Sequence, residues 1–121
     1  MYDPGEYRSA RPFIQNEARD SEGTREYVIL AAGTVYTDGR VLSKNSTTGR
    51  AAPYDPNAQD GTEVARGILI GDYDTTGGER LALMLTRLAE VKRDLIDWGG
   101  IDADGIAAGT AALATNGILI V

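Results

Sequence analysis

The sequence predicts a mainly β domain with one short C-terminal α-helix, preceded by an extended N-terminal arm. Residues 28–121 contain short apolar runs separated by Gly, Pro, Asn and Asp, which is typical of strands joined by tight turns. Residues 102–117 instead carry small apolar side chains at helical spacing. Residues 1–27 contain ten charged side chains and no sustained apolar period. We therefore expect a flexible arm over 1–27 and a compact β-rich body over 28–121.

Size and composition exclude several classes of function. A chain of 121 residues suits one domain, and its net charge of −6, with no cluster of Lys and Arg, argues against nucleic acid as a direct ligand. The chain has no Cys and no His, which removes disulfides, zinc ribbons and the commonest general base. No apolar run approaches the ~20 residues of a membrane span, and the first residues lack the basic start and apolar middle of a signal peptide.

The arm has one apolar anchor, which is the segment Arg11-Pro12-Phe13-Ile14. Proline disfavours the helical conformation in the residue before it, so Arg11 is expected to be extended, and Phe13 is the only Phe of the chain. Two interpretations stay open. The arm is either a tail with incidental apolar residues, or a segment that orders on a partner by adding a β-strand.

The first half of the body begins with a strand near Tyr27–Leu30, and a second strand is expected over 34–36. Asp38-Gly39 then predicts a hairpin turn, because both residues tolerate positive φ, with a return strand at Val41-Leu42. Residues 51–60 contain Pro53 and Pro56 and are expected to form a surface loop.

The second half contains two clearer strands, over 63–70 and 81–88. The run over 81–88 has helical propensity, but its short length and the preceding Gly-Gly favour a buried strand. Residues 90–98 are ambiguous and are interpreted as a short strand that ends at Trp98. Asp102 is the expected N-cap of the helix, Asn116-Gly117 its end, and residues 118–121 a buried last strand.

The body offers no catalytic constellation, so we predict no enzyme, no cofactor and no metal. Asp72 with Asp74, and Asp102 with Asp104, are carboxylate pairs that can serve acid–base chemistry or bind Ca²⁺. A third acidic ligand and a distal Glu are missing, so turn and helix-cap roles are favoured. Trp98, which precedes Gly99-Gly100, is interpreted as a core or interface aromatic in preference to an exposed stacking platform.

Several segments, read in order, resemble the lambda-type bacteriophage head decoration proteins, the capsid-stabilising protein D family. These segments are Leu30-Ala31-Ala32-Gly33-Thr34-Val35, Pro53-Tyr54-Asp55-Pro56-Asn57-Ala58-Gln59-Asp60-Gly61, Ala65-Arg66-Gly67-Ile68-Leu69, Gly77-Gly78, Ala89-Glu90-Val91, Leu95-Ile96-Asp97-Trp98 and the Ala-rich helix followed by Gly117-Ile118-Leu119-Ile120-Val121. The resemblance covers residues 28–121.

The resemblance implies a small barrel-like β domain (a β-tulip) that forms homotrimers on the outside of the expanded capsid at three-fold and quasi-three-fold sites. The implied partner is the major capsid protein of a tailed phage, and the implied role is to reinforce the shell against DNA pressure. The protein would be made in the host cytoplasm and reside on the virion. The family's arm pairs as a strand with the capsid protein. Our candidates for capsid-binding residues in the matching segment are Arg8, Arg11, Pro12, Phe13 and Ile14, and Trp98 is a candidate for the trimer interface or the core.

Two alternatives remain at this point. One is a small monomeric β-barrel domain that binds or hydrolyses a ligand, with the Asp72–Asp74 turn and the 54–60 loop at its mouth. The other is a phage tail accessory protein. A monomer with a concave pocket would favour the first, whereas a trimer would favour decoration.

Overall fold

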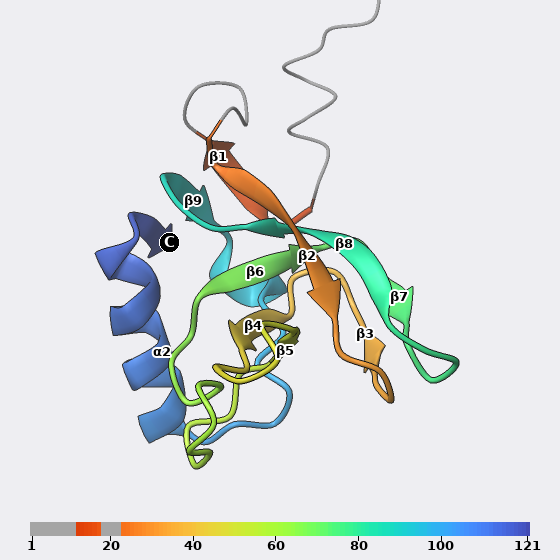
Figure 1. The fold of residues 1–121 in the computed structure, drawn as a ribbon. Coiled ribbons are helices and arrows are strands. Elements are labelled where there is room, and N and C mark those ends of the chain that lie inside the picture. The colour runs from red at the N-terminus through yellow and green to blue at the C-terminus, as the bar shows by residue number, and fades with distance from the viewer. Residues whose placement is uncertain (1–11, 18–22) are drawn as a thin grey trace, which may run out of the picture.

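The computed structural model describes residues 12–17 and 23–121, which form a mainly β fold with one α-helix near the C-terminus, as predicted (Figure 1). The strands are β1 (Ile14–Glu17), β2 (Arg25–Leu30), β3 (Val35–Tyr36), β4 (Val41–Lys44), β5 (Ala51–Pro53), β6 (Gly67–Ile70), β7 (Tyr73–Asp74), β8 (Arg80–Leu85), β9 (Ala89–Val91) and β10 (Ile118–Ile120). The helices are the 3₁₀-helix η2 (Arg93–Leu95) and the α-helix α2 (Ala103–Thr115).

Five strands close into a barrel in the order β2-β5-β4-β6-β8. Its longest antiparallel pair joins β2 and β8, from Arg25 opposite Leu85 to Leu30 opposite Arg80. The barrel closes where β2 and β5 run parallel, with Leu30 opposite Ala51. Closure removes edge strands from a sheet, and here it rests on this single residue pair.

The remaining strands form two smaller sheets. In the three-stranded sheet β1-β9-β10, β1 is antiparallel and β10 parallel to the central β9. The amide of Lys92 donates to the carbonyl of Phe13 at 2.7 Å, and that of Arg93 to the carbonyl of Val121 at 2.9 Å. Phe13 and Val121 therefore lie at the same end of this sheet. β3 and β7 pair separately (Figure 1).

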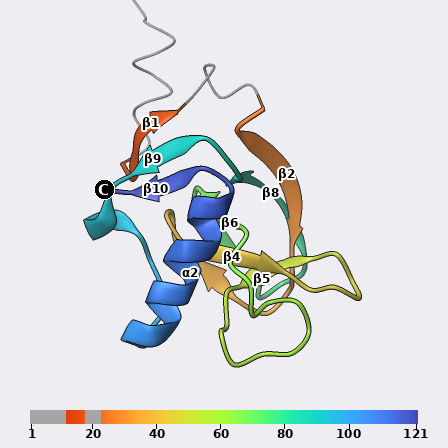
Figure 2. The ribbon, with the colours of Figure 1, turned by 90° about the vertical axis from the view of Figure 1, so that its left-hand side faces the viewer.

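The helix α2 covers one side of the barrel and has the ends that the sequence predicts (Figure 2). The side chain of Asp102 accepts a hydrogen bond from the amide of Gly105 at 2.8 Å, and the helix ends at Asn116, before Gly117 with a φ of 81°. A Cβ on Gly109 would lie 2.6 Å from the Trp98 ring, so a glycine at this position lets the helix approach the barrel closely.

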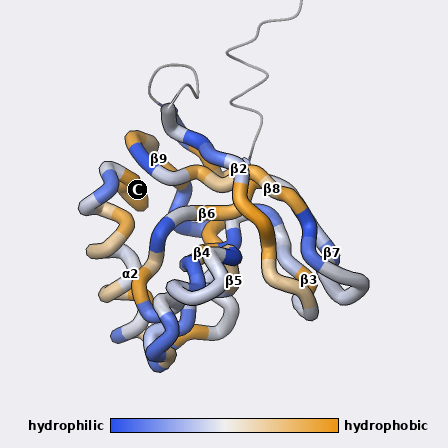
Figure 3. The backbone as a smooth tube through the Cα atoms, viewed as in Figure 1, coloured by the Kyte–Doolittle hydropathy of each residue, from blue (hydrophilic) through white to orange (hydrophobic). Residues whose placement is uncertain are grey.

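The buried side chains form two clusters that share strands. The barrel core fills the interior of the barrel and comprises Val28, Leu30, Tyr36, Leu42, Ala51, Leu69, Ala82 and Met84. The flank core lies outside the barrel and comprises Phe13, Ile14, Val41, Tyr54, Ala65, Ile68, Ile70, Leu85, Ala89, Val91, Ile96, Leu113 and Ile118. Neighbouring residues of β4, β6 and β8 thus point alternately into the two cores, as the alternation of a strand requires. Figure 3 shows apolar residues along β2, β6 and β8.

The predicted hairpin at Asp38-Gly39 is wrong, although the turn itself is present. The amide of Arg40 donates to the carbonyl of Thr37 at 3.1 Å, and Gly39 has a φ of 88°. The flanking strands do not pair with each other, since β3 pairs with β7 while β4 pairs with β5 and β6. Turn residues determine the local reversal of the chain, whereas the choice of partner strand depends on which side chains the barrel core buries.

The expected boundary after Tyr27 does not coincide with an element boundary. β2 begins at Arg25 and contains Tyr27, and β1 pairs with β9 while Phe13 and Ile14 are buried in the flank core. The anchor of the expected arm therefore packs against the body. The physical reason is that burial of these two large apolar side chains stabilises the packing of the segment on the body. A strand of four residues is too short to show a period in the sequence, so its pairing cannot be recognised there. Residues 1–11 of the expected arm lie outside the described residues.

The C-terminal segment is only partly buried, in contrast to the expectation. Ile118 is fully buried in the flank core, but Leu119 and Val121 are about half exposed. Residues 90–98, which the sequence left ambiguous, divide into the end of β9, the helix η2 and an extended stretch that reaches Trp98.

Candidate functional site

The N-terminal strand β1 is fastened to β2 by a buried ion pair. The carboxylate of Glu17 accepts hydrogen bonds from Nε and Nη2 of Arg25, both at 2.7 Å, and from Oγ1 of Thr24 at 2.6 Å. The two charged side chains are only 8% and 14% exposed. Bidentate pairs of this kind fix geometry strongly, so the pair holds the end of β1 against the start of β2.

The predicted capsid-binding residues are placed unequally. Arg8 and Arg11 lie outside the described residues. Pro12 is exposed, whereas Phe13 and Ile14 face the flank core and not solvent. A direct contact of the Phe13 or Ile14 side chain with a partner would require β1 to leave β9.

Trp98 packs edge-on against Tyr54, with ring centroids 6.1 Å apart and an interplanar angle of 66°. It is half-buried and lies against the flank core. The Tyr54 hydroxyl donates to the carbonyl of Gly105 at 2.8 Å, and burial raises the pKa of Tyr54, with the carboxylates of Asp102 and Asp55 adding to the effect. The packing gives Trp98 a role in the core, and its role in a trimer interface stays a prediction.

The carboxylates that the sequence singled out hold turns and the helix cap. Asp72 accepts from the amide of Asp38 at 2.7 Å, while Asp38 accepts from the amide of Gly71 at 2.6 Å, so the two loops bind each other reciprocally. Asp74 accepts from the hydroxyl and amide of Thr76, and these hydrogen bonds lower its pKa.

Asp72 and Asp74 do not share a mouth with the 54–60 loop. A cavity of about 440 Å³ lies beside residues 53–57, and its other walls come from Arg40 and residues 99–102. Neither aspartate lines this cavity. Over residues 12–17 and 23–121, no three acidic side chains gather as metal ligands, and no helix has the length and apolar character needed to cross a membrane.

The outer face of the β2·β8 pair presents exposed apolar side chains. Tyr27 lies opposite Leu83, and Ile29 opposite Leu81. Tyr27 is 73% and Leu81 60% exposed. Sequence reasoning missed this patch, although its signal is present as apolar residues on both faces of one strand. Contiguous exposed apolar surface of this kind is typical of sites that bind other proteins.

The fold places the chain among small closed β-barrel domains with one short helix. The comparison with protein-family models identifies it more closely. The model of the bacteriophage lambda head decoration protein D family matches residues 9–118, which is all but the first eight and last three residues. The chain therefore belongs to this family and is a structural protein of the phage head that decorates the capsid. A search of curated proteins found no match.

The family match starts before β1, at residue 9. It therefore includes the β1 strand and all of β2, which the sequence analysis had assigned to the arm or to the boundary. This agrees with the packing of Phe13 into the flank core.

Proposed function

We propose that this chain forms a homotrimer that binds the outside of the expanded capsid at three-fold sites and stabilises the shell against DNA pressure. The observation that carries the proposal is the family match over residues 9–118. The chain would be made in the host cytoplasm and then added to heads, with the major capsid protein of a tailed phage as its partner.

The exposed apolar patch on β2 and β8 supports self-association. A body of this size buries a modest core, and association of subunits adds stability to such domains. Tyr27 and Leu81 are exposed in the single chain, and covering them in an oligomer would remove apolar area from water. Light scattering of the purified chain should give three times the mass of 12.9 kDa. A monomer at micromolar concentration would contradict the trimer.

The segment before Pro12 is the proposed grip on the capsid. Strand addition takes its affinity from main-chain hydrogen bonds, so the segment need not be apolar. Ordering a backbone costs ~1–2 kcal/mol per residue, but three linked arms bind together, and such multivalency raises affinity by ~10²–10⁴. In this arrangement Arg8, Arg11 and Pro12 are the proposed contacts, and Phe13 and Ile14 hold the base of the arm in the body.

Deletion of residues 1–11 tests the arm without cutting the fold. The shortened chain keeps β1, the Glu17–Arg25 pair and the whole barrel. We expect it to fold and to keep its mass, but to protect expanded, undecorated heads of the parent phage from heat poorly. Equal protection by the shortened and full chains would contradict the arm's role.

Deletion of residues 1–27 would be a misleading test. It removes β1 and the first three residues of β2, together with the Phe13 and Ile14 side chains of the flank core. Loss of head binding by that variant would report unfolding of the body.

A further inference from the structure

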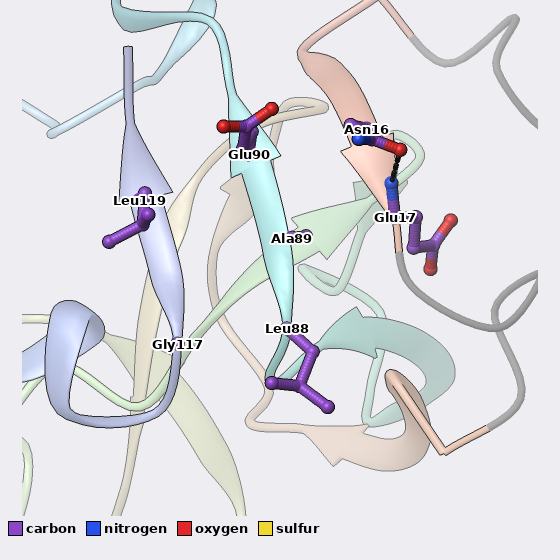
Figure 4. A pocket seen from close by; sticks show the side chains of 7 residues that line it. All are labelled: Asn16, Glu17, Leu88, Ala89, Glu90, Gly117 and Leu119. Atoms are coloured by element: carbon purple, nitrogen blue, oxygen red, sulfur yellow. Dashed lines mark hydrogen bonds between the residues drawn. The ribbon is translucent and has the colours of Figure 1, made fainter.

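A shallow apolar groove crosses the solvent-facing side of the β1-β9-β10 sheet. Its volume is about 250 Å³, and it is lined by Asn16, Glu17, Leu88, Ala89, Glu90, Gly117 and Leu119 (Figure 4). Asn16, Glu90 and Leu119 are direct neighbours across the three strands. The groove is thus built on paired strands, with Leu88 and Gly117 contributed by the turns that precede β9 and β10.

Leu88 combines an unfavourable backbone conformation with an apolar side chain that is exposed at the groove. Among the described residues it is the one non-glycine residue with positive φ, at 55°, a conformation that costs energy for leucine. Its side chain is nevertheless 51% exposed, and Leu119 across the groove is 49% exposed. The fold therefore holds a strained leucine at the surface without burying it, which is the pattern of an anchor that awaits a partner.

The floor of the groove depends on glycine. Gly117 has a φ of 81°, and a Cβ at this position would lie 3.0 Å from Cδ2 of Leu88. A larger residue would push the leucine away and fill the hollow beside it. The end of α2 therefore keeps the groove open, in addition to ending the helix.

The charged residues that line the groove indicate the chemistry of the segment that binds there. Two carboxylates and no cation line the groove. Arg25 neutralises Glu17, whereas Glu90 makes no ion pair or side-chain hydrogen bond with any residue of the described ranges, and it lies directly beside Leu119. A segment with an aliphatic side chain next to a Lys or Arg would pack on the two leucines and form an ion pair with Glu90.

We propose that this groove, with Leu88 and Leu119 as apolar anchors and Glu90 as the charged contact, docks an aliphatic–basic segment of the capsid shell. The proposal rests on the proposed function, since it names a second contact between the decoration protein and the capsid. The groove is separate from Phe13, which lies near Val121 at the opposite end of the sheet.

The test is a titration of expanded, undecorated heads of the parent phage with full-length variants. Leu88→Asn removes the anchor, and asparagine tolerates positive φ, so the variant should fold at least as stably as the wild type. Leu119→Thr removes the second anchor and keeps a residue that favours strands. Each should weaken binding at least tenfold, and Glu90→Gln should reduce the dependence of binding on salt. Val64→Thr, at another exposed apolar residue, should bind within twofold of the wild type.

The outcomes distinguish failure of the groove as a docking site from failure of the proposed function. If the wild type binds heads and both leucine variants bind equally well, the groove is overturned and the proposed function stands. If the wild type does not bind heads, both are overturned. If the leucine variants have a lower mass in solution than the wild type, the groove belongs to an interface between copies, and the capsid is not its partner.

Discussion

At the scale of single residues, Thr75 joins three stretches of chain through one hydroxyl. Its Oγ1 lies 2.8 Å from the carbonyl of Ala31 and 2.7 Å from that of Thr34, and it accepts from the Thr34 amide at 3.0 Å. The side chain is fully buried, so water cannot replace these partners. The hydroxyl therefore holds the end of β2, the start of β3 and β7 in register.

Replacing this hydroxyl should be costly although the shape is kept. Thr75→Val removes the hydroxyl from the Thr34 amide and the Ala31 carbonyl, while the Thr34 carbonyl keeps its hydrogen bond from the Thr75 amide. We expect the free energy of unfolding in urea to fall by ~1–3 kcal/mol. Thr75→Ser keeps the hydroxyl and serves as the control with a smaller loss. Equal losses in the two variants would mean that the hydroxyl contributes no more to stability than the methyl group does.

Two buried tyrosines make the fold sensitive to alkali. Burial raises the pKa of Tyr36 above its ordinary value of about 10, and it raises that of Tyr54 likewise. A raised pKa in the folded state means that the neutral phenol contributes stability fully below the unfolded pKa, and that this stability is lost as pH rises through the folded pKa.

The free energy of unfolding should therefore hold up to about pH 10 and fall above it. Tyr36→Phe should make that fall shallower, because the ring stays buried and no longer ionises. The Tyr36 hydroxyl lies 3.4 Å from the carbonyl of Ala31, so its loss should change stability little at neutral pH. The same alkaline slope in wild type and variant would show that Tyr36 does not control the transition.

At the scale of elements, β1 depends on its ion pair. Glu17→Gln leaves the guanidinium of Arg25 buried without its counter-charge, and breaking a buried pair in this way costs ~3–5 kcal/mol. Thermal unfolding and amide exchange in β1 should both report the loss. Glu79→Gln breaks the exposed Arg50–Glu79 pair and should cost ~1 kcal/mol or less. Comparable losses would mean that Glu17 is more solvated than its 8% exposure indicates.

Elements with strong local signals could be predicted from the sequence. The helix α2 has a cap, a small-residue pattern and a glycine stop, and the apolar run of β8 has clear breaks on both sides. β1 could not be predicted, since four residues contain no measurable period and their burial depends on the distant β9. The partners of β3 and the groove at Leu88 were missed for the same reason, because they arise from contacts between segments far apart in the chain.

At the scale of the whole molecule, the two cores should unfold together. β4, β6 and β8 supply side chains to both, so neither core can lose its packing while the other keeps its strands. Leu69→Ala in the barrel core should lower stability by ~2–5 kcal/mol. The urea transition followed by Trp98 fluorescence, which reports the flank core, should shift as far as the transition followed by circular dichroism. Separate transitions would contradict this coupling.

The double use of β4, β6 and β8 also limits how the sequence can change during evolution. In β6 the consecutive positions Ile68, Leu69 and Ile70 each face a filled core, so neither face of this strand is free to drift. The exposed turns carry no such limit. We expect homologues to keep an ordered series of short apolar runs while the residues between them diverge. A profile of a whole family would then recognise such a chain where comparison with any single relative does not.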